Sequence, residues 1–302
     1  MTKLLGHSHL LSHRLRGFDE RESTAIGVAR ALAKRIAHVE FDVRATRDGK
    51  LVAFHDPFFE DDSSQWQFID SLTLTELQKQ KSLSHLATLD EVCRVFAAEA
   101  AENTLLHVDV KVSGYERQIL AVLEEHGVLT KSVIVSWLPS VLQAFNMLSP
   151  ETPLCFSHIT LVRAPWLLPF GKIFAAPIVL RSLGQLFSPF NTKLSLEFLT
   201  TRLHFHSDGN PSFVETGQDR TRCNHGHIVP RALTGPIFAL LQRTKGYVCL
   251  PVASATKSLV ADYHSNGIKV AVFSANSAAA ADSIMTTIAP DIMYMDVATV
   301  FE

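Results

Sequence analysis

The sequence predicts a (β/α)8 barrel, in which one closed sheet of parallel strands carries helices on its outer surface. Three observations support this fold class. The chain has 302 residues, a length that a single α/β barrel can fill. Short apolar runs typical of strands alternate with segments of helical period, and eight such runs are present. The alternative, an open doubly wound sheet, favours a glycine-rich first turn, which the sequence lacks.

The expected strands are short, apolar and bounded by turn residues. They are Leu10–Arg14, Val39–Val43, Leu105–Val110, Val133–Trp137, Leu154–His158, Tyr247–Pro251, Val270–Ser274 and Ile292–Asp296. The expected helices between them are Ala25–Ala37, Thr88–Glu102, Glu116–His126, Ser140–Leu148, Thr256–Gly267 and Ala278–Ala289. Asn266-Gly267 is typical of a left-handed helix C-cap.

Two features depart from a plain barrel. Leu51–His55 is an extra apolar run too close to the second strand for a helix to intervene, and Asp48-Gly49 between them favours a two-residue type I′ hairpin. The stretch from Ile159 to Pro230 replaces one crossover and is too long for a loop. We therefore expect one domain over residues 1–302, with residues 159–230 inserted as a cap over one end of the barrel.

Composition excludes several classes of protein. Hydrophobic residues make up 47% and charged residues 19%, which rules out wholesale disorder. The net charge of −2 lacks the basic excess of a nucleic-acid binder. Four cysteines without a CxxC pair, and an N-terminus without a long apolar core, favour a cytoplasmic protein with reduced thiols. No protein partner is indicated.

The mean hydropathy of +0.14 is high, and part of it lies in Leu161–Phe187. Prolines and basic residues interrupt this segment, so the sequence does not predict a membrane-spanning helix here. Two interpretations remain: an excursion buried against the main domain, or an interfacial segment that contacts a membrane surface peripherally.

Two carboxylates precede the hairpin on one strand face. Glu40 and Asp42 are two residues apart, so they point to the same side of the strand. With Asp48-Gly49 as a two-residue loop, Asp42 would face His55 across the hairpin. Like charges on a buried face require a cation, and an all-carboxylate site favours Mg²⁺ or Ca²⁺.

A third acid follows on the next strand. His107, Asp109 and Lys111 alternate with apolar residues and so share one strand face. His13-Arg14 closes the first strand in the same way. Polar side chains inside a barrel near its carboxyl end are typical of a catalytic site.

These motifs resemble the glycerophosphodiester phosphodiesterase family. The similarity is carried by HR at 13–14, EST at 22–24 and VEFDVRATRDGKLVAFHDP at 39–57. Further similar stretches are TLTELQ at 73–78, TLDEV at 88–92, VDVK at 108–111, VIVSW at 133–137, GIKVAVFSAN at 267–276 and DIMYMD at 291–296. The resemblance spans almost the whole chain except Ile159–Pro230.

The resemblance implies a role for each matching residue. The implied metal ligands are Glu40, Asp42 and Asp109, which would hold one divalent cation, Mg²⁺ or Ca²⁺. The implied general acid and base are His13 and His55, in an order left open. The implied phosphate contacts are Arg14 and Lys111.

Three positions depart from the family pattern. Leu15 replaces the glycine after His-Arg, which affects the approach of the backbone to the phosphate. Asp109 stands where glutamate is common and shortens that ligand by one methylene. Phe273-Ser274 replaces a Trp-Thr pair among the substrate contacts.

The leading expectation is metal-dependent hydrolysis of glycerophosphodiesters, or of lysophospholipids, to glycerol 3-phosphate or lysophosphatidate and an alcohol. The alternatives are a related barrel phospholipase of the sphingomyelinase D or phosphoinositide phospholipase C type, and a catalytically silent lipid- or phosphate-binding module. A separate histidine-rich group, His204, His206, Cys223, His225 and His227, is either a zinc site or a polar loop region.

Overall fold

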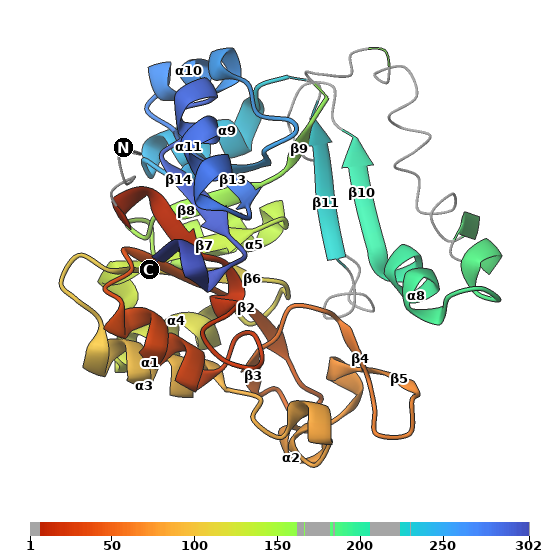
Figure 1. The fold of residues 1–302 in the computed structure, drawn as a ribbon. Helices are drawn as coiled ribbons and strands as arrows, with labels where there is room; N and C mark the ends of the chain where they lie inside the picture. Colours follow the sequence, from red (N-terminus) through yellow and green to blue (C-terminus); the bar gives the residue numbers. More distant parts are fainter. Residues whose placement is uncertain are drawn as a thin grey trace.

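Eight parallel strands close into a barrel in the computed structural model, which describes residues 7–161, 166, 182–183, 185–205, 224–229 and 231–301 (Figure 1). Their order is β1-β14-β13-β12-β8-β7-β6-β2, and pairing of β2 with β1 closes the ring. The strands are β1 (Leu10–Ser12), β2 (His38–Ala45), β6 (Leu105–Val110), β7 (Ser132–Ser136), β8 (Leu154–Ser157), β12 (Tyr247–Pro251), β13 (Lys269–Ala275) and β14 (Ile292–Met295). Each overlaps an expected strand, and the predicted fold class is confirmed.

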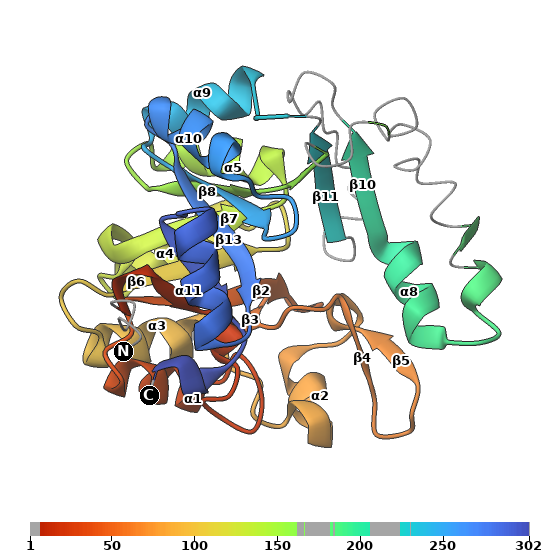
Figure 2. The same cartoon turned by 45° about the horizontal axis from the view of Figure 1, so that its top comes forward.

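Helices lie on the outer surface of the barrel (Figures 1 and 2). The helices outside the inserted region are α1 (Ala25–Ala33), α2 (Leu74–Gln78), α3 (Leu89–Glu99), α4 (Glu116–Glu125), α5 (Pro139–Leu148), α9 (Gly235–Arg243), α10 (Lys257–Ser265) and α11 (Ala278–Thr287). The sequence indicated all of them except α2 and α9. Gly267 has φ +72°, which confirms the predicted left-handed cap after α10.

The barrel strands bury both of their faces. On β2, Val39, Phe41 and Val43 belong to the large core between the strands and the helices. A second apolar cluster fills the barrel interior; it comprises Leu11, Val133, Val135, Cys155, Tyr247, Cys249, Ala271, Ile292 and Tyr294. Glu40 and Asp42 alternate with the outward-facing residues of β2 and therefore face the barrel interior.

The hairpin after β2 forms with a different turn from the one that the sequence suggested. β2 pairs antiparallel with β3 (Leu51–Ala53), and Arg44 pairs with Val52. The loop has three residues, because Thr46 pairs with Lys50 and Gly49 adopts φ +70°. Consequently Phe54, and not His55, donates its backbone N–H to the carbonyl oxygen of Asp42 (3.0 Å). The predicted type I′ register was wrong by one residue.

The inserted region contributes a second, smaller sheet. β9 (Ile159–Thr160), β11 (Asn224–Val229) and β10 (Thr201–Phe205) are parallel, in the order β10-β11-β9. Helix α8 (Thr192–Thr200) precedes β10. Figures 1 and 2 place this sheet and α8 on the same side of the barrel as the hairpin of β4 (Phe58–Glu60) and β5 (Trp66–Phe68).

Two expectations about the insertion fall largely outside the described residues. Of the segment Leu161–Phe187, only Leu161, Trp166, residues 182–183 and residues 185–187 are described. In the histidine-rich group, the backbone register pairs His204 with His227. The side chains of that pair and of His225, and the whole of His206 and Cys223, lie outside the description. Within the described part of the chain, no helix is long and apolar enough to cross a membrane.

Candidate active site

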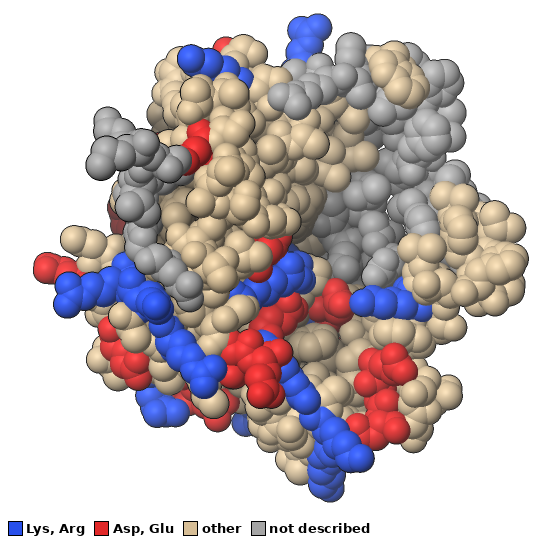
Figure 3. All heavy atoms as spheres, in the orientation of Figure 1, with Lys and Arg blue, Asp and Glu red and all other residues tan. Residues whose placement is uncertain are grey.

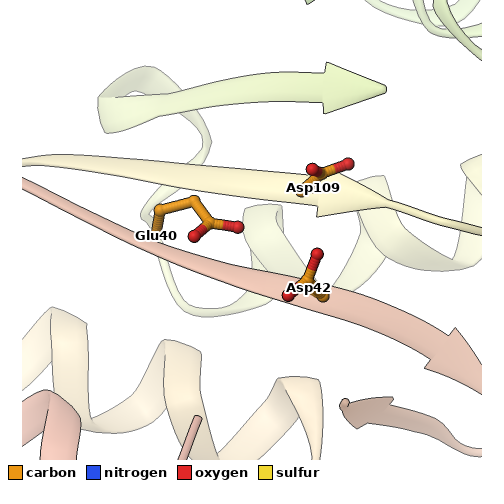
Figure 4. Close-up of side chains that lie close together, drawn as sticks. All are labelled: Glu40, Asp42 and Asp109. Carbon is orange, nitrogen blue, oxygen red and sulfur yellow. The ribbon is translucent and has the colours of Figure 1, made fainter. Parts of the chain in front are cut away.

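Three buried carboxylates meet at the carboxyl ends of two neighbouring strands. The parallel register pairs Asp42 on β2 with Asp109 on β6, and Glu40 lies two residues before Asp42 on the same face. Each of the three offers an oxygen within 4.8 Å of the others. Figure 4 shows the carboxyl groups close together between the two strands. The sequence reasoning named all three, and the fold brings them together.

This cluster has the donor set of a hard divalent cation. Among the described residues, Glu40 Oε1, Asp42 Oδ2 and Asp109 Oδ1 are buried without a hydrogen-bond partner. A buried carboxylate oxygen without a partner is costly, and a bound cation satisfies such oxygens directly. An all-oxygen set suits Mg²⁺ or Ca²⁺ better than zinc. The residues present therefore fit one divalent cation.

Two basic side chains already compensate part of the negative charge. Lys111 Nζ donates to Asp109 Oδ2 at 2.6 Å and lies 3.1 Å from Asp42 Oδ1. Arg14 Nε lies 3.4 Å from Asp42 Oδ2. Arg14 and Lys111 are the two predicted phosphate contacts. Each therefore lies near a different carboxylate oxygen of Asp42.

The uneven distribution of these cations splits the carboxyl pKa values. Burial, added to the charges of Asp42 and Asp109, raises the pKa of Glu40 well above its usual value. Burial acts on Asp42 in the same direction, but the charges of Lys111, His55 and Arg14 outweigh it and hold its pKa far below the usual range. An added cation would therefore favour the ionised form of Glu40.

His13 follows β1 and joins the cluster to the last strand. Its Nδ1 lies 2.6 Å from Asp296 Oδ1, just beyond β14, and its Nε2 lies 3.9 Å from Glu40 Oε2. Because a carboxylate only accepts hydrogen bonds, Nδ1 carries the proton of the neutral ring. Nε2 is then the nitrogen that faces the carboxylate cluster.

His55 occupies the other side of the site with a similar arrangement. Its Nδ1 lies 2.7 Å from Asp56 Oδ1, and the buried Arg44 donates from Nε to its backbone carbonyl at 2.7 Å. Burial lowers the pKa of His55, although the negative charge of Asp42 opposes this shift. The register correction therefore moves His55 out of the strand pair but leaves it beside Asp42.

The backbone after β1 adopts an unusual conformation in place of the family glycine. Arg14 and Leu15 have φ +53° and +56°, a region that disfavours side chains with a Cβ atom. Leu15 is buried in the main core, which holds this conformation in place. In this turn, the Arg14 backbone N–H donates to Glu40 Oε2 at 2.9 Å. The turn thus orients the first carboxylate of the cluster.

Sequence reasoning gave no role to several residues of this site. Asp296 accepts from Arg16 Nη1 at 2.9 Å as well as from His13, and Arg16 Nε donates to Glu22 at 2.8 Å. Asp56 is the partner of His55. A signal existed for both aspartates, since one ends the last barrel strand and the other forms a His-Asp pair, but their distances to the histidines depend on the tertiary structure.

Acidic, basic and imidazole groups converge at the carboxyl ends of the barrel strands. This fold and this site together define a class of protein, the barrel enzymes that cleave phosphodiesters. The family model "Glycerophosphoryl diester phosphodiesterase family" matches residues 6–164. The chain belongs to this family and is a phosphoric diester hydrolase of the glycerophosphodiester phosphodiesterase type.

Solved structures of similar fold cover nearly the whole chain at low sequence identity. A Silicibacter pomeroyi DSS-3 protein, assigned provisionally as a glycerophosphoryl diester phosphodiesterase, has a TM-score of 0.63 and 16% identity over 97% of this chain and 91% of its own. A glycerophosphodiester phosphodiesterase from Agrobacterium tumefaciens str. C58 has a TM-score of 0.57 and 13% identity over 97% and 98%. An Oleispira antarctica phosphodiesterase, solved with the product sn-glycerol-3-phosphate, has a TM-score of 0.57 and 18% identity over 95% and 92%. No curated protein matches the sequence.

Proposed function

We propose that this enzyme hydrolyses glycerophosphodiesters to glycerol 3-phosphate and an alcohol with the help of one divalent cation, Mg²⁺ or Ca²⁺. The observation that carries the proposal is the buried group Glu40, Asp42 and Asp109, each with an oxygen that lacks a hydrogen-bond partner. These three residues would hold the cation. When bound, it would supply positive charge to the phosphodiester oxygens on which negative charge accumulates.

The chain's own cations are suited to bind the phosphate. Arg14 and Lys111 are mostly buried beside the acidic cluster, so their charges act in a medium with little screening. Lys111 contacts Asp109 and Asp42, and Arg14 contacts Asp42 and Glu22, but guanidinium and ammonium groups each carry several N–H bonds and so keep donors for a phosphate. We assign both to substrate phosphate contact.

The two histidines are suited to move protons. His13 and His55 each bind a carboxylate through Nδ1, which orients the ring and leaves Nε2 for a reacting oxygen. In our proposal one accepts the proton of the nucleophile, and the other donates a proton to the leaving alkoxide. The nucleophile is either water or the neighbouring glycerol hydroxyl.

Lysophospholipids with one acyl chain are a second candidate substrate class, with lysophosphatidate as the product. Exposed apolar side chains in the inserted region favour it, among them Leu186 (65% exposed) and Phe190 (84%).

We further propose that residues 1–302 form one barrel domain with residues 159–230 as its inserted cap. The buried free thiols Cys93, Cys155 and Cys249 support our assignment to the reducing cytoplasm.

A substrate panel tests the proposed reaction. Release of glycerol 3-phosphate, lysophosphatidate and phosphatidate is measured with glycerophosphocholine, lysophosphatidylcholine and diacyl phosphatidylcholine respectively, with and without a chelator. We expect turnover of the first substrate, loss of turnover in chelator and recovery on adding Mg²⁺ or Ca²⁺. Unchanged turnover in chelator would refute the role of the cation. Absence of turnover on every diester would favour a binding module.

Variants test the roles of the residues in the same assay. His13→Ala and His55→Ala should each lower kcat by at least about 100-fold, since general acid–base groups contribute roughly 10²–10⁴-fold. Asp109→Asn should raise the cation concentration needed for half-maximal activity. His126→Ala is the matched control, because His126 pairs with Asp90 on the helical exterior. Equal activities of His13→Ala, His55→Ala and the control would overturn the assignment.

A further inference from the structure

Large exposed apolar side chains concentrate in one part of this molecule. Among the described residues, four of the six that are exposed lie between positions 166 and 190. They are Trp166 (71% exposed), Leu183 (36%), Leu186 (65%) and Phe190 (84%), which we call the apolar lobe. The other two, Ile26 and Met147, are isolated. Isolated exposed apolar residues are ordinary, whereas a group of them marks an interaction surface.

Three residues of the lobe are spaced so that they lie on one face of a helix. Residues 182–183 and 185–187 are helical, and residues 188–190 continue as a turn. Leu183, Leu186 and Phe190 are three and four positions apart, so they follow one side of this segment. A row of this kind can enter an apolar medium as a unit.

The charge of the surrounding chain points to an anionic partner. Residues 159–196 contain no aspartate or glutamate, although the whole chain has 30 acidic residues. The same stretch contains Arg163, Lys172, Arg181 and Lys193. Apolar and basic residues without acids are the composition that anionic lipid surfaces attract. Each basic residue near such a surface strengthens binding about fivefold.

The segment that follows the lobe comes near the candidate active site. Burial raises the pKa of Asp56, but the hydrogen bond from His55 and nearby positive charges outweigh it, and the net pKa is lowered. One of these charges is Lys193, which is exposed at the start of α8. Figure 3 shows acidic and basic side chains gathered in a hollow at the centre of the face that also carries the α8 region. The lobe is therefore followed directly along the chain by a segment that comes near Asp56.

We infer that the apolar lobe docks on a membrane surface that contains anionic lipids. Leu186 and Phe190 enter the headgroup and acyl boundary, and the exposed Lys193 lies among the headgroups. This inference concerns where the enzyme works, and it holds whether the substrate is a lipid or a water-soluble diester.

Vesicle flotation tests the inference with the full-length chain. Vesicles of phosphatidylcholine alone are compared with vesicles of equal parts phosphatidylcholine and phosphatidylglycerol, at low and high salt. We expect binding to the anionic vesicles that weakens at high salt. The double variant Leu186→Ser with Phe190→Ser should bind at least about tenfold more weakly, because it removes two large apolar side chains from the boundary.

Met147→Ser is the matched control, since Met147 is 82% exposed but lies on α5, away from the lobe. It should bind vesicles like the wild type. Hydrolysis of glycerophosphocholine should be equal in all three proteins, which separates failure of docking from failure of the proposed function. A blue shift of tryptophan emission on anionic vesicles, lost in Trp166→Phe, gives a second measure. Equal vesicle binding by the double variant and Met147→Ser overturns the inference. The inference is also overturned if the wild type binds no vesicle, for example because it forms dimers through the lobe instead.

Discussion

Asp296 holds the ring of His13, which we propose as a proton-transferring group. It accepts from His13 Nδ1 and from Arg16 on the same oxygen, Oδ1, at 2.6 and 2.9 Å. When its amide nitrogen is turned toward Asp296, Asn276 donates to Oδ2 at 3.1 Å. Asp296 thus connects the turn after β1 to the end of β14. The same contact selects which nitrogen of His13 faces the acidic cluster.

Asp296→Asn should lower kcat by about 10- to 1,000-fold and change KM by less than about threefold, because it perturbs the proton-transferring ring more than phosphate binding. Asp296→Glu should restore part of the loss. The measurement is steady-state kinetics on glycerophosphocholine.

The control is Asp291→Asn, because Asp291 makes a similar pair with the exposed His264 at 2.8 Å, before β14 begins. The control should keep wild-type kinetics. A rise in KM alone for Asp296→Asn would contradict the positioning role.

Helix capping explains two stretches that the sequence analysis noted only as family-like. The stretches TLTELQ and TLDEV contain capping boxes, in which Thr73 pairs with Glu76 and Thr88 with Glu91. In each box the threonine side chain accepts from the third helical N–H, and the glutamate accepts from the cap N–H. These boxes fix where α2 and α3 begin.

Thr88→Ala should reduce the free energy of unfolding by about 1 kcal/mol, the usual value of a lost N-cap. Urea unfolding measures this change. Ser63→Ala is the control, because Ser63 lies in an exposed turn where its backbone N–H, and not its side chain, contacts Asp61. Equal unfolding midpoints for the two variants would show that the box adds nothing.

The buried His107 and the half-buried His38 form a pair near the amino ends of β6 and β2, at the other end of the barrel from the candidate active site. His38 Nδ1 and His107 Nε2 are 3.1 Å apart. Burial lowers the pKa of His38 to about 4 and that of His107 well below its usual value. Both rings are therefore neutral in the folded barrel. His107 and Asp109 thus share one face of β6 but lie in different layers of the barrel. Only Asp109 belongs to the candidate active site.

Acid should weaken the barrel through this pair. The unfolded chain takes up a proton on His38 near pH 6.5, whereas the folded chain does so only near pH 4. Stability is therefore complete above pH 6.5 and falls as the pH decreases toward 4. At pH 5 the loss from His38 is about 2 kcal/mol. Urea unfolding at pH 7 and pH 5 measures it. His38→Gln should show a smaller loss than His126→Gln, and equal losses would contradict the assignment.

At the scale of the whole molecule, the barrel keeps a group of like charges buried at one end. Glu40, Asp42 and Asp109 are at most 7% exposed, and two nearby basic side chains compensate them only in part. Folding therefore works against their mutual repulsion unless a cation is bound. Cation binding and folding stability are linked for this reason.

A divalent cation should consequently raise the Tm of the protein. At a concentration about 100 times its Kd, the cation adds about 2.7 kcal/mol to the free energy of unfolding, which corresponds to a rise on the order of 5 °C. Thermal unfolding with Mg²⁺ and with Ca²⁺ measures the effect and shows which ion binds more tightly. Asp109→Asn should abolish the rise. A wild-type Tm that neither ion changes would count against a cation at this site.

The sequence by itself determined the barrel and the three acids that meet inside it. Strand periodicity placed Glu40 and Asp42 on one face, and the alternation around Asp109 placed the third acid on the next strand. Both inferences succeed because the two-residue period of a strand is a local property, and because parallel strands end at the same side of a sheet.

Only the tertiary structure decided the partners of these residues. The hairpin has a three-residue loop and not a two-residue one, so Phe54 replaces His55 opposite Asp42. The contact between His13 and Asp296 joins positions 283 residues apart. The exposure of Phe190 likewise follows from how the insertion packs. The contact between His13 and Asp296 depends on closure of the barrel, which brings the first strand beside the last, whereas periodicity describes only neighbours along the chain.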